Sequence, residues 1–262
     1  MSKQVVHFAH ANGFPARTYT KLFSFFDPRF DIRYLERHAH DPEFPVTDGW
    51  HALKDELRRS IERDFEKPVI GLGHSLGGIL HLLVSIDNPH LYKQIILLDA
   101  PIISRFSSNG IRFLKALNLM DRLSSSRMTR ARRNLWKSRE DAYKHFKAKP
   151  KFAAFDDDVL CDYIEYGTVE TDGGFRLSFD PQIEAAIYRN LPHDLPSLKG
   201  KLSVPVTYIG GVESREAKLA RLSFMQKNFP IDFHFLPGSH LFPFEIPRET
   251  AAKIASITWN NG

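Results

Sequence analysis

The chain has 262 residues, of which 42% are hydrophobic and 26% charged, with a formal net charge of +5 at pH 7. This length suffices for one large domain with a complete core, and the modest positive charge gives no reason to expect a nucleic-acid partner. The single cysteine, Cys161, excludes an intrachain disulfide. No apolar run reaches the roughly 20 residues of a membrane span, and no segment has the form of a secretory signal. We therefore expect a cytoplasmic protein without a membrane span, either a monomer or a homodimer.

Strand-like and helix-like segments alternate in the first hundred residues. Short apolar runs predict strands at 5–9, 30–35, 69–72 and 94–98. Apolar residues at helical spacing predict a helix over 49–65 with Asp48 as its N-cap, and a second helix after Ser75. Strands that alternate with helices indicate an α/β fold, in which a parallel sheet carries helices on both faces.

The same alternation resumes near residue 204. Strands are predicted at 204–209 and 231–236, and helices at 216–229 and 247–259. We therefore assign 1–101 and 200–262 to one core domain, and 102–199 to an inserted, mainly helical cap. The cap has helical patterns at 110–123, 138–147 and 156–166, and a hairpin turn at 171–175.

Charge is divided unevenly within the insertion. Residues 105–151 contain 14 Lys or Arg and 3 Asp or Glu, whereas residues 152–196 contain 2 and 10. This division fits two solvated faces that attract each other. It also fits a basic lip that draws anionic substrates toward a site. The sequence leaves both interpretations open.

The segment with the clearest chemical meaning is Gly73-His74-Ser75-Leu76-Gly77, which follows the apolar run 68–70. A Gly-x-Ser-x-Gly motif between a strand and a helix is typical of a nucleophile elbow, in which a sharp turn exposes the serine hydroxyl. Glycines two residues before and after the serine fit this turn because larger side chains would clash there. Ser75 is therefore the candidate nucleophile.

A serine nucleophile needs a base and donors for the oxyanion. His240, in the loop after the last predicted strand, is the candidate base. The backbone N–H of Leu76 is one candidate oxyanion donor, because it follows the nucleophile at the start of a helix. The second donor comes from the loop 10–15, where the sequence allows either Asn12 or Phe14.

The carboxylate that would orient His240 has two candidates. Asp99 follows the strand at 94–98, and Glu213 follows the strand at 204–209. A charge at the tip of a buried strand usually needs a partner, and either residue is suitably placed for His240. We favour Asp99 and keep Glu213 as the alternative.

These motifs, in this order, resemble the α/β-hydrolase fold family, in its Ser-His-acid esterase and lipase-like branch. The resemblance covers 4–100 and 200–260, and includes the turn Glu36-Arg37-His38-Ala39-His40, which is similar to the family's Arg-Gly-His-Gly turn. It makes a metal role for His38 and His40 improbable. Relatives usually carry a β-hairpin before the first motif, for which this chain has no room, so we expect about six mostly or wholly parallel strands.

The resemblance also bears on the acid. The family usually has Asp three residues after the glycine that ends the fifth strand, and that position is Ser214 or Glu213, depending on which glycine is counted. Some relatives place the acid after the preceding strand, and Asp99 lies 24 residues after Ser75, which fits that arrangement. The haloalkane dehalogenases and epoxide hydrolases of this fold use an Asp nucleophile, so Ser75 favours acyl transfer.

The sequence therefore predicts a serine hydrolase of small to medium carboxylic esters or thioesters. A carbon–carbon bond hydrolase or lyase-type enzyme with the same triad, and a binding protein that has lost catalysis, are the alternatives. We expect neither a metal nor another cofactor, since no Gly-rich phosphate loop and no Cys-x-x-Cys pair occurs. The candidate substrate-binding residues are His10, His74, Phe106 and Trp136. The cap aromatics either line an apolar pocket or form the cap's own core.

Overall fold

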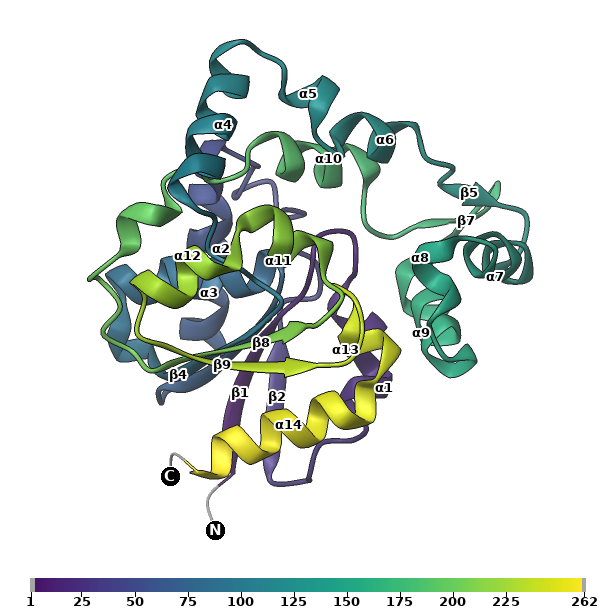
Figure 1. The fold of residues 1–262 in the computed structure, drawn as a ribbon. Helices are drawn as coiled ribbons and strands as arrows, with labels where there is room; N and C mark the ends of the chain where they lie inside the picture. Colours follow the sequence, from purple (N-terminus) through teal and green to yellow (C-terminus); the bar gives the residue numbers. More distant parts are fainter. Residues whose placement is uncertain (1–2, 261–262) are drawn as a thin grey trace.

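A parallel sheet of six strands lies at the centre of the computed structural model, which describes residues 3–260 (Figure 1). The strands occur in the order β2-β1-β3-β4-β8-β9, and every neighbouring pair is parallel. Their bounds are β1 (Gln4–Ala9), β2 (Phe30–Tyr34), β3 (Val69–His74), β4 (Tyr92–Leu98), β8 (Val206–Gly211) and β9 (Ile231–Leu236). The predicted α/β fold with a sheet of about six strands is confirmed.

Helices cover both faces of this sheet because successive residues of each buried strand point to opposite sides. Ile96 and Leu98 of β4 belong to the core beneath α1 (Thr20–Phe23) and α14 (Pro247–Asn260). Ile95 and Leu97 belong to the opposite core, which is closed by α2 (His51–Asp64), α3 (Leu76–Asp87) and α12 (Leu222–Asn228). The remaining short elements of the core domain are η1 (Ala16–Tyr19), η2 (Asp48–Trp50), η3 (Pro89–Leu91), α11 (Arg215–Ala220) and α13 (Phe242–Glu245).

Two helix predictions in the core were wrong in detail. Asp48 does not cap α2, because Trp50 has a left-handed φ of 62° and the helix begins at His51. Tertiary hydrogen bonds hold this turn: the Gly49 N–H and the Trp50 indole N–H donate to backbone carbonyls of the cap segment, over 3.1 and 3.0 Å. The helix predicted over 216–229 is also divided, since Arg221 has a φ of 58° between α11 and α12.

Between β4 and β8 the chain forms seven α-helices, the 3-10 helix η4 (Leu195–Leu198) and a small antiparallel sheet, β5-β7-β6, within the described residues. Figure 1 shows this segment, in teal and green, above and beside the main sheet. We call residues 102–199 the cap segment, and its role as a separate domain remains a prediction. Its elements are α4 (Arg105–Ala116), α5 (Met120–Leu123), α6 (Ser126–Ala131), β5 (Leu135–Trp136), α7 (Arg139–Lys147), α8 (Pro150–Ala153), α9 (Asp157–Gly167), β6 (Thr168–Thr171), β7 (Gly174–Leu177) and α10 (Pro181–Arg189).

The structure confirms most of the local predictions in the cap segment. Helices α7 and α9 match the patterns at 138–147 and 156–166, and the hairpin turn lies between β6 and β7. The helical pattern at 110–123 instead belongs to two helices. The first begins at Arg105 with the Ser104 side chain as its N-cap, and Asn118, with a φ of 55°, separates it from the second.

Ion pairs join the basic and acidic halves of the cap segment. Lys147 lies 2.8 Å from Asp157, and Arg139 lies 2.8 Å from Glu165. Arg132 forms an ion pair with the buried Glu184. These three ion pairs are contacts of the kind expected of faces that attract each other. No helix of the described chain is long and apolar enough to cross a membrane.

Candidate active site

Ser75 lies in the sharp turn between β3 and α3, with a φ of 52° and a ψ of −113°. The motif's glycines permit this turn. A Cβ atom on Gly73 would lie 2.4 Å from the Gly78 nitrogen, and one on Gly77 would lie 2.1 Å from the Ala9 carbonyl oxygen. Both contacts are with backbone and cannot be relieved by side-chain rotation. The local sequence therefore holds Ser75 in a strained backbone conformation, with its side chain half-buried at the turn.

His240 lies between β9 and α13, within hydrogen-bond distance of both Ser75 and Asp99. Its Nε2 atom is 3.0 Å from Ser75 Oγ, and its Nδ1 atom is 2.6 Å from Asp99 Oδ2. Asp99 follows β4 with a φ of 42°, and its side chain is fully buried. Glu213, by contrast, is exposed, and no described contact joins its side chain to His240. Of the two candidate acids, the structure brings Asp99 to the imidazole.

The Asp99 carboxylate accepts three further hydrogen bonds. The Tyr208 hydroxyl donates over 2.9 Å, the Ser214 hydroxyl over 2.5 Å and the Gly211 N–H over 3.3 Å. Burial by itself would raise the pKa of Asp99, but the hydrogen bonds from His240, Ser214 and Tyr208 outweigh burial and lower the pKa. Asp99 is therefore ionised at neutral pH. Ser214 occupies one of the two positions at which the family usually has its acid. In this structure its hydroxyl instead donates a hydrogen bond to the Asp99 carboxylate.

His74, predicted to bind substrate, instead joins two loops of the site. Its Nε2–H donates to the His240 carbonyl oxygen over 2.9 Å, so its Nδ1 atom accepts from the Tyr19 hydroxyl over 2.7 Å. The Ala11 N–H donates to the same hydroxyl over 3.2 Å. Burial, followed by the nearby His240, lowers the pKa of His74 to about 3, so its ring is neutral. The chain of hydrogen bonds Ala11–Tyr19–His74–His240 thus connects the loop after β1 to the candidate base, and no sequence motif pointed to Tyr19.

The loop after β1 lies beside Ser75. Asn12 and Phe14 both line the cavity that contains the serine hydroxyl. The Phe14 N–H already donates to the Ala11 carbonyl oxygen over 3.1 Å, whereas the Asn12 N–H has no acceptor among the described hydrogen bonds. Leu76 is the first residue of α3, where backbone N–H groups have no partner within the helix. Of the two candidate donors in the loop after β1, the Asn12 amide is therefore the one without a described acceptor.

A cavity of about 470 Å³ opens in front of Ser75 and His240, between the core domain and the cap segment. Its wall is mostly apolar and includes Trp50, Pro101, Ile103, Ile111, Ile187 and Leu241. A smaller cavity of about 130 Å³ shares Ser75 and His240 and extends among Ile79, Ala100 and Leu195. The two together offer space for a small or medium-sized molecule on both sides of the serine hydroxyl.

Polar side chains stand at particular points of this wall. They are Asn12, Ser107, Ser124, Ser125, Lys151, Tyr188 and Glu216. Among the residues that the structure describes, Asp99, Glu216 and His240 form the one group with metal-ligand atoms within 4.8 Å of one another. The hydrogen bond between Asp99 and His240 already uses one such atom of each. We therefore treat Glu216 as a charged wall residue and not as a metal ligand.

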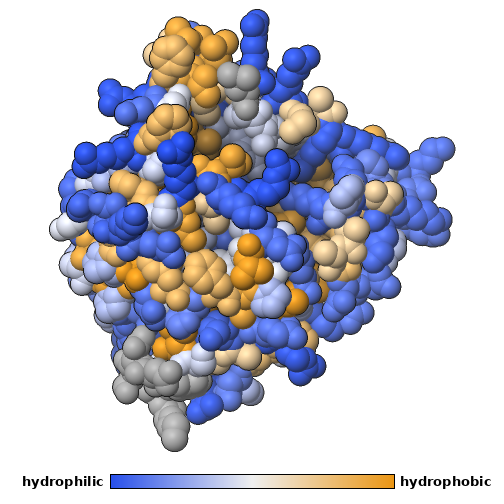
Figure 2. Space-filling model, in the orientation of Figure 1, coloured by the Kyte–Doolittle hydropathy of each residue, from blue (hydrophilic) through white to orange (hydrophobic). Residues whose placement is uncertain are grey.

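The other three predicted substrate-binding residues also lie outside the cavity walls. His10 is buried and hydrogen-bonded to the Ala11 carbonyl oxygen and the His38 N–H. Phe106 is 70% exposed on α4, where Arg221 stacks over its ring. Figure 2 shows apolar side chains gathered on the upper surface, where Figure 1 places α4. Trp136 is buried in the cap segment against His145 and Phe146, so it belongs to that segment's own core.

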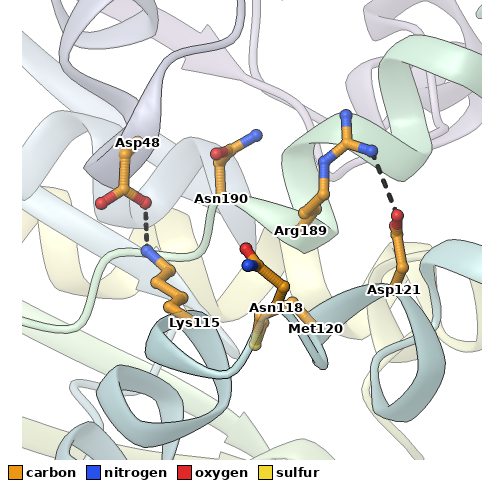
Figure 3. A pocket seen from close by; sticks show the side chains of 7 residues that line it. All are labelled: Asp48, Lys115, Asn118, Met120, Asp121, Arg189 and Asn190. Carbon is orange, nitrogen blue, oxygen red and sulfur yellow. Dashed lines mark hydrogen bonds and ion pairs between the residues drawn. The ribbon is translucent and has the colours of Figure 1, made fainter.

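A separate hollow of about 310 Å³, away from Ser75 and His240, lies between η2, α4, α5 and the end of α10 (Figure 3). Its charged side chains point at one another: Lys115 bonds to Asp48, and Arg189 lies 3.4 Å from Asp121. Lys115 also donates to the Leu191 carbonyl oxygen over 2.6 Å. These charges are satisfied within the protein, which gives no indication of a ligand.

Comparison with known proteins identifies the family. A model of the alpha/beta hydrolase family matches residues 8–253. The chain belongs to the α/β hydrolase family. Members of this family are hydrolases, so the protein is an enzyme of that kind. Among curated relatives, the Abhydrolase domain-containing protein AFT2-1 of Alternaria alternata is 24% identical over 241 residues, covering 74% of this chain and 87% of the relative.

Solved structures show the same fold at lower identity. The E-2-(acetamidomethylene)succinate hydrolase has a TM-score of 0.73 and 19% identity, with 98% of this chain and 91% of that one covered. The thioesterase domain from the curacin biosynthetic pathway has a TM-score of 0.72 and 16% identity, with coverages of 97% and 91%. These likenesses show the fold of the chain.

Proposed function

We propose that this α/β hydrolase is a serine hydrolase that cleaves small to medium carboxylic esters or thioesters through an acyl-enzyme. One observation carries the proposal: His240 lies 3.0 Å from Ser75 Oγ through Nε2 and 2.6 Å from Asp99 Oδ2 through Nδ1. A nucleophile, a base and an ionised acid in hydrogen-bonded series are the arrangement that activates a serine hydroxyl.

In this proposal, Ser75 Oγ attacks the carbonyl carbon of the ester while His240 Nε2 takes the hydroxyl proton. The Asp99 carboxylate holds Nδ1–H of the imidazole and stabilises the imidazolium that forms. His240 then gives its proton to the departing alcohol or thiol, and the acyl group stays on Ser75. A water molecule, deprotonated by His240, attacks the acyl carbon and releases the acid and the free serine.

The tetrahedral oxyanion would be held by the N–H groups of Leu76 and Asn12. Both belong to fixed backbone, at the start of α3 and in the loop tied to Tyr19, so little reorganisation accompanies charge development. Of the two donors that the sequence allowed, Asn12 is preferred, because the Phe14 N–H is already bonded to Ala11.

The thioesterase among the similar structures supports the inclusion of thioesters. A carbon–carbon bond hydrolase or lyase-type enzyme remains the alternative within the fold, because the same triad can act on a diketone. A binding protein without catalysis is disfavoured by the geometry, since all three hydrogen-bonding groups are present and aligned.

Hydrolysis of a graded series of 4-nitrophenyl esters and acyl thioesters, from two to eight carbons, tests this proposal. We expect turnover by the unmodified enzyme and none above background by Ser75→Ala, with both proteins folded by circular dichroism. Dienone-type substrates are assayed in parallel. Turnover of those compounds without turnover of any ester or thioester would replace this proposal by the carbon–carbon alternative.

A further inference from the structure

One cation faces the candidate active site from the cap segment. Lys151, in the short helix α8, lines the cavity of about 470 Å³ together with Ser75 and His240. Its Nζ atom lies 5.1 Å from the centre of the Phe14 ring, in the loop after β1. The ammonium group therefore lies on the oxyanion-loop side of the cavity. Its side chain is exposed to the open cavity.

No ion pair holds Lys151 within the described part of the chain, whereas three of its basic neighbours are paired with acidic residues of 152–196. Lys147, Arg139 and Arg132 of the same basic stretch are paired with Asp157, Glu165 and Glu184. The charges nearest to Lys151 are Glu184, Glu216, Arg132 and Lys149. Glu184 is already neutralised by Arg132. The ammonium group of Lys151 is thus available to a ligand in the cavity.

The cavity wall also carries a negative charge beside the candidate base. Glu216, on α11, has a carboxylate oxygen within 4.8 Å of ligand atoms of Asp99 and His240. An anionic group on a substrate would be repelled by Glu216 and attracted by Lys151. The adjoining cavity among Ile79, Ala100 and Leu195 is mostly apolar, although Glu216 also lines it, and it suits an uncharged hydrocarbon portion. Charge and apolar surface together define one orientation for a substrate.

We infer that Lys151 binds an anionic substituent of the substrate, so that the preferred substrates are esters or thioesters with a carboxylate or similar anion at one end and an apolar group at the other. Only the ester chemistry in this inference rests on the proposed function; the binding of an anion by Lys151 does not depend on it. It assigns Lys151 a role in substrate selection and none in bond cleavage. Pairing with an ammonium group in a partly enclosed cavity favours the anionic substrate by about tenfold.

Two esters of similar size provide the kinetic test: 4-nitrophenyl butyrate, which is neutral, and mono-4-nitrophenyl glutarate, which carries a carboxylate. We expect Lys151→Met to lower the kcat/KM ratio of the glutarate to the butyrate ester about tenfold, mainly through KM. Lys151→Arg should retain most of that preference. Lys149→Met is the matched control, because Lys149 makes a similar contact with an aromatic ring, 5.3 Å from Phe146, without lining the cavity.

An equal loss of activity on both esters in Lys151→Met would overturn the inference, since it would indicate a structural or oxyanion role. An unchanged ratio, or an equal change in Lys149→Met, would overturn it as well. Binding is measured separately by NMR titration of Ser75→Ala with monomethyl glutarate and methyl butyrate, with and without Lys151→Met. If Ser75→Ala prefers the anionic ester through Lys151 while the unmodified enzyme hydrolyses no ester, the proposed function fails and the anion site stands.

Discussion

The Asp99 carboxylate lies 2.6 Å from His240 Nδ1, although Asp99 follows β4 and not β8, the strand after which the family usually carries its acid. The β8 end contributes Ser214 instead, whose hydroxyl donates to the same carboxylate over 2.5 Å. Strands β4 and β8 are neighbours in the sheet, so side chains from both strand ends reach the same point. The His240 imidazole therefore has Asp99 as its carboxylate partner. Ser214, near the position where the family usually has its acid, holds that carboxylate by a hydrogen bond.

Asp99→Asn should lower kcat about 10³- to 10⁴-fold, because the amide cannot stabilise the imidazolium and favours the wrong tautomer of His240. Glu213→Gln, at an exposed position with no described contact to His240, should change kcat less than twofold. Steady-state hydrolysis of one 4-nitrophenyl ester measures both variants. The opposite ranking of the two would assign the acid to Glu213.

Tyr19→Phe should lower kcat about three- to tenfold, the usual net worth of one hydrogen bond, and leave KM nearly unchanged. The lost hydroxyl bridges the Ala11 N–H and His74, which holds the His240 loop. Tyr143→Phe is the control, because it removes a hydroxyl hydrogen bond to Asp157 at an exposed position. If Tyr19→Phe lowers the melting temperature alone and leaves kcat and its pH profile intact, Tyr19 has only a structural role.

Gly77→Ala should destabilise the protein by more than about 3 kcal/mol, since its Cβ would lie 2.1 Å from a backbone oxygen of β1. Gly110→Ala, inside helix α4, should instead stabilise it by about 0.5 to 1 kcal/mol, because no atom lies within 4 Å of the new Cβ. Urea unfolding compares the two. A mild effect for Gly77→Ala would show that the turn at Ser75 is less tightly packed than described.

The sheet was predictable from sequence because its strands are short apolar runs bounded by turn residues, and β3 is buried throughout. Ser75 and His240 were predictable because each occupies a fixed place relative to a strand. The choice between Asp99 and Glu213 was not, since both follow neighbouring strands and only the loop conformations decide which side chain reaches the imidazole.

Other features depend on contacts between distant segments. The left-handed turn at Trp50 is held by bonds to α10 and the residue after it, which local propensity cannot indicate. Lys151 is one of 14 basic residues in 105–151. The sequence does not indicate which of these residues form ion pairs and which leave their charge free for a ligand. Phe106 and Trp136 were predicted to bind substrate because they are aromatic residues of the cap segment, but residue type alone does not distinguish an exposed ring, a packed ring and one that lines a cavity.

Stability should fall steeply as the pH decreases from about 6.5 toward 3. Burial lowers the pKa of His7, His10 and His74 to about 3 from the ordinary 6.5, so the unfolded chain binds these protons in that interval and the folded chain does not. Each contributes up to about 1.4 kcal/mol per pH unit. Glu56, whose pKa burial raises to about 7, opposes this between pH 7 and 4.5.

Chemical denaturation at half-unit pH intervals measures this slope. His7→Gln should make this slope shallower by about one proton, or about 1.4 kcal/mol per pH unit. A slope that His7→Gln leaves unaltered would mean that the His7 ring is already protonated in the folded state at pH 5.

The central claim, that Ser75 is a nucleophile activated by His240 and Asp99, is tested most directly by the site of covalent labelling. The enzyme is incubated with a small fluorophosphonate and examined by intact mass and peptide mapping. The account predicts rapid addition of one phosphonyl group on Ser75, much slower addition in Asp99→Asn, and none in Ser75→Ala. Failure of the folded enzyme to react, or labelling equal in Ser75→Ala, would contradict it.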